Sequence, residues 1–220
     1  MAYSTTMKII LTGATGMVGE GVLLECLATA DVEKVLVLGR KPSGHHHPKL
    51  EEMLVADFLE LEPSDRLRGY DGCFYCAGVS SVGMSEADYT RVTFDTAMHV
   101  AKVIADERMV LVHVSGASTD GTEQSKVMWA RVKGRAENAL MKLPFRAVYN
   151  FRPGLMKPVK GQRNLKTSYR VGLVFLPVLR LIFPMLTLSE VARAMLNCVR
   201  SGAPKSVLEV ADIKALAASE

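Results

Sequence analysis

A chain of 220 residues, of which 49% are hydrophobic and 23% charged, can bury one substantial core, so we expect a single globular domain over residues 1–220. The net charge of +4 is too small to favour nucleic acid binding, and four cysteines do not indicate a disulfide scaffold. Residues 1–6 are a short polar leader rather than a signal peptide, which predicts a cytoplasmic protein.

The first predicted elements are a buried strand and a helix joined by a glycine-rich turn. Residues 7–11 (MKIIL) are too short for a helix, and Gly13, Gly16 and Gly19 follow them. Gly13 allows a sharp turn, Gly16 lets backbone N–H groups approach a pyrophosphate, and Gly19 lies on the packing face of the helix. A second apolar strand at residues 34–38 completes a β-α-β unit, and this context favours a dinucleotide site over an ordinary glycine turn.

The sequence of this turn, T-G-A-T-G-M-V-G at residues 12–19, resembles that of the short-chain dehydrogenase/reductase superfamily in its extended and atypical branches. The resemblance implies an α/β protein with a doubly wound parallel sheet, the Rossmann fold, that binds NAD or NADP. It also implies that the turn and the start of the helix contact the cofactor through Gly13, Thr15, Gly16, Met17, Val18 and Gly19.

The end of the second strand distinguishes NAD from NADP. NAD-binding relatives place an acidic side chain there, whereas NADP-binding relatives place an arginine. This chain has Arg40 and Lys41 at that point, while Asp31 and Glu33 lie at the other end of the strand. Charge complementarity with a 2′-phosphate therefore favours NADP(H) over NAD(H), and the alternative is a solvated pair of surface cations.

The next segment offers a histidine cluster and an aspartate. His45, His46 and His47 are adjacent in a loop and cannot easily converge on one ion, so we expect no metal site. Residues 52–55 predict a third strand. The resemblance places Asp57, which follows that strand, beside the adenine ring, and the alternative is a turn residue.

Residues 72–76 (GCFYC) predict a fourth strand. Cys73 and Cys76, three apart on a strand, point to opposite faces with Cα atoms about 10 Å apart, which argues against a redox disulfide. The resemblance implies that Cys76, Ala77 and Gly78 lie against the ribose and pyrophosphate of the cofactor. A long helix is expected to begin at Ser85, with its apolar stripe in the core.

The fifth predicted strand, residues 109–115 (MVLVHVS), carries Ser115 to the edge of the sheet where open α/β proteins bind ligands. His113 shares the face of Ser115. Ser115 matches the catalytic serine of the superfamily, which hydrogen-bonds the substrate oxygen, and the alternative is an ordinary strand-end hydroxyl.

The next helix, predicted over residues 125–140, corresponds to the helix in which the superfamily carries Tyr-x-x-x-Lys. This chain has Trp129 and Lys133 at those two positions. An indole cannot exchange a proton at neutral pH, so the acid–base role does not carry over to Trp129. Lys133 is expected to hold the cofactor, and the alternative is a solvated lysine paired with Glu137.

The C-terminal third is predicted to build the substrate side. A sixth strand at residues 146–151 ends in R-P-G, which resembles extended members and implies that Pro153 contacts the cofactor and that residues 155–190 form a substrate-side insertion. The apolar residues 171–186 predict a pocket wall, with a membrane-surface segment as the alternative. Five cations without an acidic residue suit an anionic ligand or surface: Lys157, Lys160, Arg163, Lys166 and Arg170. Beyond them, Thr187 and Glu190 have the spacing of a capping box at the start of a helix, and residues 207–210 predict a last edge strand.

The residues and the resemblance together predict an NADP(H)-dependent oxidoreductase or epimerase-like enzyme. Its expected substrate is a small carbonyl compound or a sugar nucleotide. Because the tyrosine is absent, the alternative is a protein that senses NADP(H) without turnover.

Overall fold

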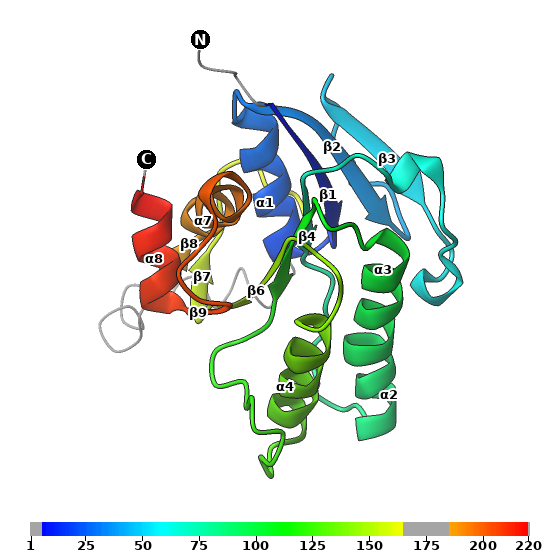
Figure 1. Cartoon of the computed structure of the whole chain (residues 1–220), viewed down its shortest axis with the longest axis vertical. Coiled ribbons are helices and arrows are strands. Elements are labelled where there is room, and N and C mark those ends of the chain that lie inside the picture. Colours follow the sequence, from blue (N-terminus) through cyan, green and yellow to red (C-terminus); the bar gives the residue numbers. More distant parts are fainter. Residues whose placement is uncertain (1–5, 165–184, 220) are drawn as a thin grey trace.

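A seven-stranded parallel sheet forms the centre of the computed structural model, which describes residues 6–164 and 185–219. The strand order is β3-β2-β1-β4-β5-β6-β9, and every neighbouring pair is parallel (Figure 1). In that order the strands are Leu50–Leu54, Val32–Gly39, Met7–Thr12, Gly72–Tyr75, Val110–Val114, Ala147–Arg152 and Val207–Glu209. The predicted doubly wound sheet is confirmed, and its strand order reverses between β1 and β4.

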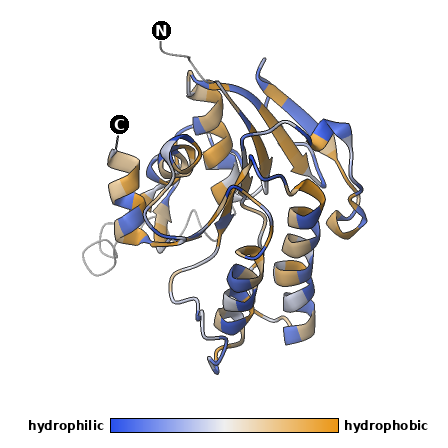
Figure 2. Cartoon of the chain, in the orientation of Figure 1, coloured by the Kyte–Doolittle hydropathy of each residue, from blue (hydrophilic) through white to orange (hydrophobic). Residues whose placement is uncertain are grey.

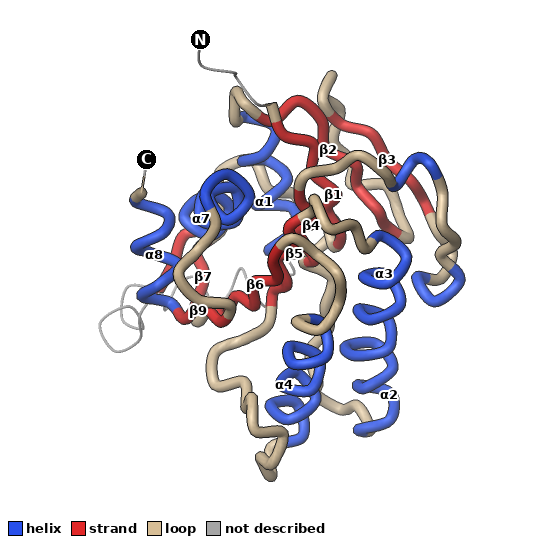
Figure 3. Tube along the Cα trace, viewed as in Figure 1, coloured by secondary structure: helices blue, strands red, loops and turns tan. Residues whose placement is uncertain are grey.

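Helices cover both faces of the sheet (Figure 3). One face carries α1 (Met17–Ala28), α7 (Leu188–Ser201) and α8 (Val210–Ala218). The other carries α2 (Glu86–Thr90), the π-helical turn η3 (Arg91–Asp95), α3 (Thr96–Ile104) and α4 (Met128–Leu140). The short 3-10 helices η1 (Phe58–Glu60) and η2 (Asp65–Leu67) connect β3 to β4, and a separate parallel pair is formed by β7 (Leu155–Lys157) and β8 (Met185–Thr187).

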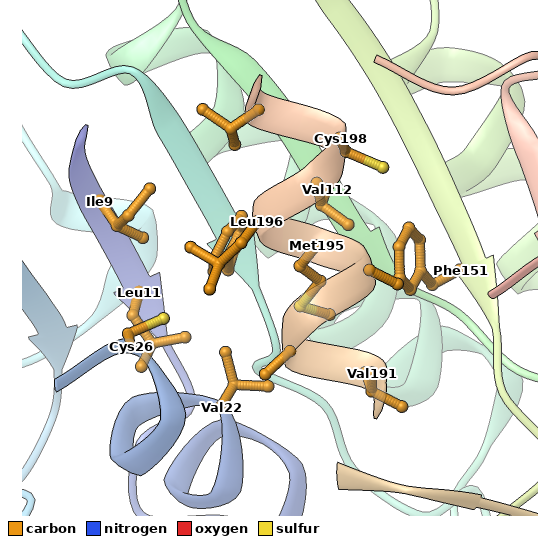
Figure 4. Packing of buried hydrophobic residues seen from close by; sticks show 14 of the residues in the cluster. Ile9, Leu11, Val22, Cys26, Val112, Phe151, Val191, Met195, Leu196 and Cys198 are labelled. Carbon is orange, nitrogen blue, oxygen red and sulfur yellow. The ribbon is translucent and has the colours of Figure 1, made fainter. Parts of the chain in front are cut away.

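Each face of the sheet has its own hydrophobic core. Ile9 and Leu11 of β1 are fully buried beneath α1 and α7, and Met195 of α7 lies among them (Figure 4). Ile10, on the opposite face, is buried in the second core with residues of α3. A strand buried on both faces needs a continuous apolar run, which is why β1 and its neighbours are coloured as hydrophobic in Figure 2.

Two predicted boundaries were wrong. The strand predicted at residues 52–55 is β3, which begins and ends earlier. The long helix predicted from Ser85 does begin there, and it runs to Ile104 through the π-helical turn η3. The helix predicted from Ser125 begins at Met128, because the Asp120 carboxylate accepts hydrogen bonds from Gln124 N (2.8 Å) and Ser125 N (2.6 Å) and holds this segment in a turn.

Other local signals were correct. Ser85 caps α2 by accepting a hydrogen bond from Asp88 N at 3.1 Å. Thr187 and Glu190 form the reciprocal capping box at the start of α7. The last strand, β9, pairs with β6 at the edge of the sheet, as predicted for residues 207–210.

The region expected to form the substrate side is described only in part. Lys166, Arg170 and the apolar residues 171–184 lie outside the described residues, and with them most of the predicted pocket wall or membrane-surface segment. Within residues 6–164 and 185–219, no helix is long and apolar enough to cross a membrane.

Candidate functional site

A cavity of about 660 Å³ opens at the carboxyl ends of β1, β2 and β4, next to the point where the strand order reverses. Its volume is in the range of a cofactor or drug-sized ligand. Eight of the predicted cofactor residues line it: Gly13, Thr15, Gly16, Arg40, Lys41, Cys76, Ala77 and Gly78. Residues that were not predicted complete the wall: Ala14, Val37, Gly39, Ala56 and Phe58.

The three glycines of the turn differ in what an added Cβ atom would contact. Gly13 has φ +75°, and a Cβ there would lie 2.6 Å from the carbonyl carbon of Cys76. A Cβ on Gly19 would overlap the carbonyl oxygen of Gly13. Gly16 has an ordinary extended backbone (φ −105°, ψ 163°), and a Cβ there would meet only Gly13 O at 3.4 Å. The fold therefore requires Gly13 and Gly19, whereas Gly16 leaves open space above the turn.

That open space lies at the start of α1. Met17, Val18 and Gly19 form the first turn of this helix, where backbone N–H groups have no acceptor within the helix and the helix dipole is positive. These three residues do not line the cavity, and what suits this helix start to an anion is their free backbone N–H groups. The fit to a pyrophosphate is therefore a property of the backbone.

Thr12 joins the glycine turn to the loop after β4. Its hydroxyl accepts hydrogen bonds from Cys76 N and Ala77 N, each at 3.1 Å, and its side chain is fully buried. The sequence analysis missed this residue. A hydroxyl side chain at the end of an otherwise apolar central strand is the sequence pattern that would have indicated Thr12.

The side of the cavity next to the end of β2 carries two cations. Arg40 and Lys41 are exposed and form no hydrogen bond or ion pair with the described part of the chain. Asp57 caps η1 by accepting a hydrogen bond from Leu59 N at 3.0 Å, while its neighbours Ala56 and Phe58 line the cavity. The hydrogen bond of Asp57 is the one expected of a turn residue.

Ser115 lies directly after β5 and is almost fully buried. Its Oγ lies 3.1 Å from Oγ1 of Thr119, which in turn donates to Gly116 O at 2.7 Å. Because Thr119 has a single hydroxyl proton, Ser115 is the donor between the two hydroxyls. The sequence analysis missed Thr119, although hydroxyls four residues apart at a strand end are a recognisable pattern.

Lys133 is not paired with Glu137. Both carboxylate oxygens of Glu137 accept from Arg152, at 3.0 Å from Nε and 2.6 Å from Nη2, and Arg152 also contacts Glu209 at 3.1 Å. The Lys133 ammonium forms no hydrogen bond or ion pair with the described residues, and desolvation by burial lowers its pKa. The alternative interpretation of Lys133 as a solvated lysine paired with Glu137 is therefore wrong.

Ser115 and Lys133 lie on either side of Gly116. A Cβ on Gly116 would lie 3.9 Å from the Cδ and Cε atoms of Lys133, an ordinary van der Waals contact, so the lysine stem lies beside this glycine. Trp129 is partly buried one turn earlier on α4. The carbonyl of Pro153 accepts a hydrogen bond from Ala117 N at 3.2 Å and so fixes the loop after Ser115. None of Ser115, Trp129, Lys133 and Pro153 lines the large cavity.

A buried polar pair lies beneath this edge of the sheet. His113 and Asn150 face each other across β5 and β6, with Nδ1 of the histidine 2.9 Å from Oδ1 of the asparagine. Burial lowers the pKa of His113 to about 4, so the imidazole is neutral and donates from Nδ1. Asn150 Nδ2 has no hydrogen-bond partner, the one such buried side-chain atom in the described part of the chain.

The cysteines and histidines show no redox or metal geometry. All four cysteines are free, and burial raises the pKa of the Cys73 thiol to about 12 and that of Cys76 well above its usual value. Among residues 6–164 and 185–219, no three His, Cys, Asp or Glu side chains are grouped to hold a metal ion.

Comparison of the sequence with known proteins relates this chain to a family of NAD-dependent proteins. Residues 9–137 match the sequence model of the NAD dependent epimerase/dehydratase family. Leucinostatins biosynthesis cluster protein T of Purpureocillium lilacinum is 30% identical over 144 residues, which is 62% of this chain and 52% of that protein. Protein HTATIP2 of Rattus norvegicus is 26% identical over 155 residues, 68% of this chain and 62% of that protein. The chain thus spans about half to three fifths of the length of these two curated relatives.

A solved structure shows the same fold. UDP-glucuronic acid 4-epimerase of Bacillus cereus, in complex with NAD, superposes with a TM-score of 0.65 over 93% of this chain and 76% of that chain, at 14% identity. At this identity the likeness concerns the fold alone.

Proposed function

The chain belongs to the NAD-dependent epimerase/dehydratase family, whose members bind a nicotinamide dinucleotide, and from this premise we propose that it is an NADP(H)-dependent oxidoreductase or epimerase-like enzyme. The proposed substrate is a small carbonyl compound or a sugar nucleotide. The observation that carries the proposal is a cavity that combines an open glycine turn at the start of α1 with two unpaired cations, Arg40 and Lys41.

The two ends of the cavity suit the two ends of such a cofactor. The backbone N–H groups at the start of α1 suit the pyrophosphate, and the guanidinium of Arg40 can pair bidentately with a 2′-phosphate. We assign Ser115 and Lys133 to the reacting end, because both lie at the carboxyl edge of the sheet and the Lys133 ammonium, although it is attracted by the Glu137 charge, forms no hydrogen bond or ion pair among the described residues. When bound, the cofactor would supply or accept a hydride.

The substrate class is supported by two observations. The described cations Lys157, Lys160 and Arg163 follow β6 without an acidic residue among them, which suits an anionic group such as a nucleoside diphosphate. The superposed Bacillus cereus protein is an epimerase of a UDP sugar.

A second candidate is a protein that binds NADP(H) without turnover. Trp129 occupies the position of the proton-exchanging tyrosine, and the proton of Ser115 is donated to Thr119. Neither side chain is therefore arranged to donate a proton to a substrate oxygen in this structure.

Titration with NADPH and NADH, followed by turnover assays on a panel of carbonyl compounds and UDP sugars, tests both candidates. An enzyme should oxidise NADPH, or convert a UDP sugar, with at least one member of the panel, and Ser115→Ala and Lys133→Met should lower that rate. Tight NADPH binding without turnover would favour the sensor. Failure to bind either cofactor would refute both.

A further inference from the structure

Glu20 is a fully buried carboxylate that the cofactor cavity does not explain. It lies in the first turn of α1 with no exposed side-chain surface, and it does not line the cavity. Three donors converge on it: Arg163 N at 2.7 Å, Asn164 N at 2.8 Å and His45 Nε2 at 2.9 Å. Desolvation raises the pKa of this carboxyl, but the hydrogen bonds outweigh it and the pKa is lowered, so Glu20 is ionised.

The donors to Glu20 come from two segments that are distant in sequence and also bind each other. Arg163 Nη1 donates to Gly44 O at 3.2 Å, and Asn164 Nδ2 donates to Ser43 O at 3.5 Å. We call Glu20, residues 43–45 and residues 163–164 the Glu20 cluster. Through it, the loop that follows β2 is bound to the helix that follows the glycine turn.

The Glu20 cluster begins two residues after Lys41. On one side of the two cations, Gly39 O accepts a hydrogen bond from Val55 N at 3.0 Å. On the other side, Ser43 N donates to Glu52 Oε1 at 2.8 Å, and the Glu20 cluster follows. The backbone that carries Arg40 and Lys41 is thus fixed at both ends, although neither side chain has a partner among residues 6–164 and 185–219.

We propose that Glu20 is a positioning residue for cofactor selection: it fixes residues 43–45, and thereby holds Arg40 and Lys41 where they meet the 2′-phosphate of NADP(H). This inference rests on the NADP(H) preference proposed above. Preorganised cations bind a phosphate more tightly than mobile ones, because less ordering entropy is lost on binding. Since NADH lacks the 2′-phosphate, its affinity should depend less on the position of Arg40 and Lys41 than the affinity for NADPH does.

The test compares the ratio of the dissociation constants for NADH and NADPH in a set of variants. Glu20→Gln removes the charge and turns an amide N–H2 toward backbone donors. His45→Leu removes the one side-chain bond between Glu20 and the loop, and His45→Gln restores an N–H donor. We expect the ratio to fall by about twofold to thirtyfold in Glu20→Gln and in His45→Leu, which is the range for residues that affect a ligand without contacting it. In His45→Gln the ratio should recover in part.

Glu25→Gln is the matched control, because Glu25 lies on the same helix and accepts a hydrogen bond from Ser189 Oγ at 2.6 Å, away from the loop. Its ratio should equal that of the wild type. Circular dichroism and NADH affinity show whether each variant is folded, and His45→Leu carries the test if Glu20→Gln does not fold.

The outcomes separate the inference from the proposed function. A wild-type protein that binds NADPH and NADH equally would refute the NADP(H) preference itself. A wild-type preference that survives in both Glu20→Gln and His45→Leu would overturn the positioning role while leaving the proposed function intact. An equal loss of affinity for both cofactors would also overturn it, because Glu20 would then support only the general structure of the site.

Discussion

Replacement of Gly16 by valine should abolish cofactor binding in a protein that remains folded. Gly16 lines the cavity, and its backbone angles are accessible to any L residue. A Cβ would meet only Gly13 O at 3.4 Å, so nothing in the protein opposes the substitution strongly. The valine side chain would instead occupy the open space above the first turn of α1.

The magnitudes on stability and binding differ widely. Replacing glycine reduces the conformational entropy of the unfolded chain and stabilises the folded protein by ~0.4–1 kcal/mol. Valine is also a poorer helix cap than glycine, which costs about 1 kcal/mol, so the free energy of unfolding should change little. A displaced pyrophosphate would lose two or more hydrogen bonds to backbone N–H groups, each worth ~1.5–3 kcal/mol for a charged acceptor. The affinity for NADPH should therefore fall by more than about 100-fold.

The assay is calorimetric titration with NADPH beside urea unfolding of the same samples. Gly13→Ala is the informative contrast, because Gly13 has φ +75° and a Cβ there would lie 2.6 Å from backbone atoms of Cys76. That variant should lose more than about 1–2 kcal/mol of stability from the left-handed backbone alone. Unchanged NADPH affinity in Gly16→Val, or unfolding of Gly16→Val with a stable Gly13→Ala, would refute the reasoning.

Three further predictions follow from the site. Arg40→Ala should weaken NADPH binding by about tenfold or more, because at least one charge-assisted hydrogen bond is lost, and should leave NADH binding unchanged. Equal losses of affinity for the two cofactors in calorimetry would contradict this. NADPH should quench the fluorescence of Trp129, which is the single tryptophan of the chain. Trp129→Tyr should raise the turnover rate, at most by the roughly 100- to 10,000-fold that general acid catalysis contributes, and the added substitution Ser115→Ala should cancel this gain. Glu137→Gln should lower the free energy of unfolding by ~1–3 kcal/mol, because the largely buried Arg152 guanidinium loses its charged bidentate partner and keeps only the Glu209 carboxylate, and no measurable loss in urea unfolding would contradict that role.

The sheet and the cradle could be predicted because their signals are local in sequence. The apolar run before Gly13 is long enough for one strand, and a strand followed by glycines and a helix within a β-α-β unit is typical of dinucleotide-binding proteins. The capping box at Thr187 and the edge strand at residues 207–210 were also predictable, because each depends on residues three or four apart or on a short alternation. Arg40 and Lys41 were predicted at the cavity for the same reason, as the end of a strand defines which residues reach the edge of the sheet.

The pairing of charged and polar groups was decided only by the tertiary structure. Periodicity offered Glu137 as an alternative partner for Lys133, but Arg152 donates hydrogen bonds to both carboxylate oxygens of Glu137. His45 looked like part of a solvated loop, and its partner is Glu20, 25 residues away on α1. A local pattern records which face a side chain takes, whereas a buried charge is stabilised by whichever donors the packed elements bring within hydrogen-bond distance. That choice depends on the positions of all the elements together, and it left Arg40, Lys41 and Lys133 without a hydrogen bond or ion pair among the described residues.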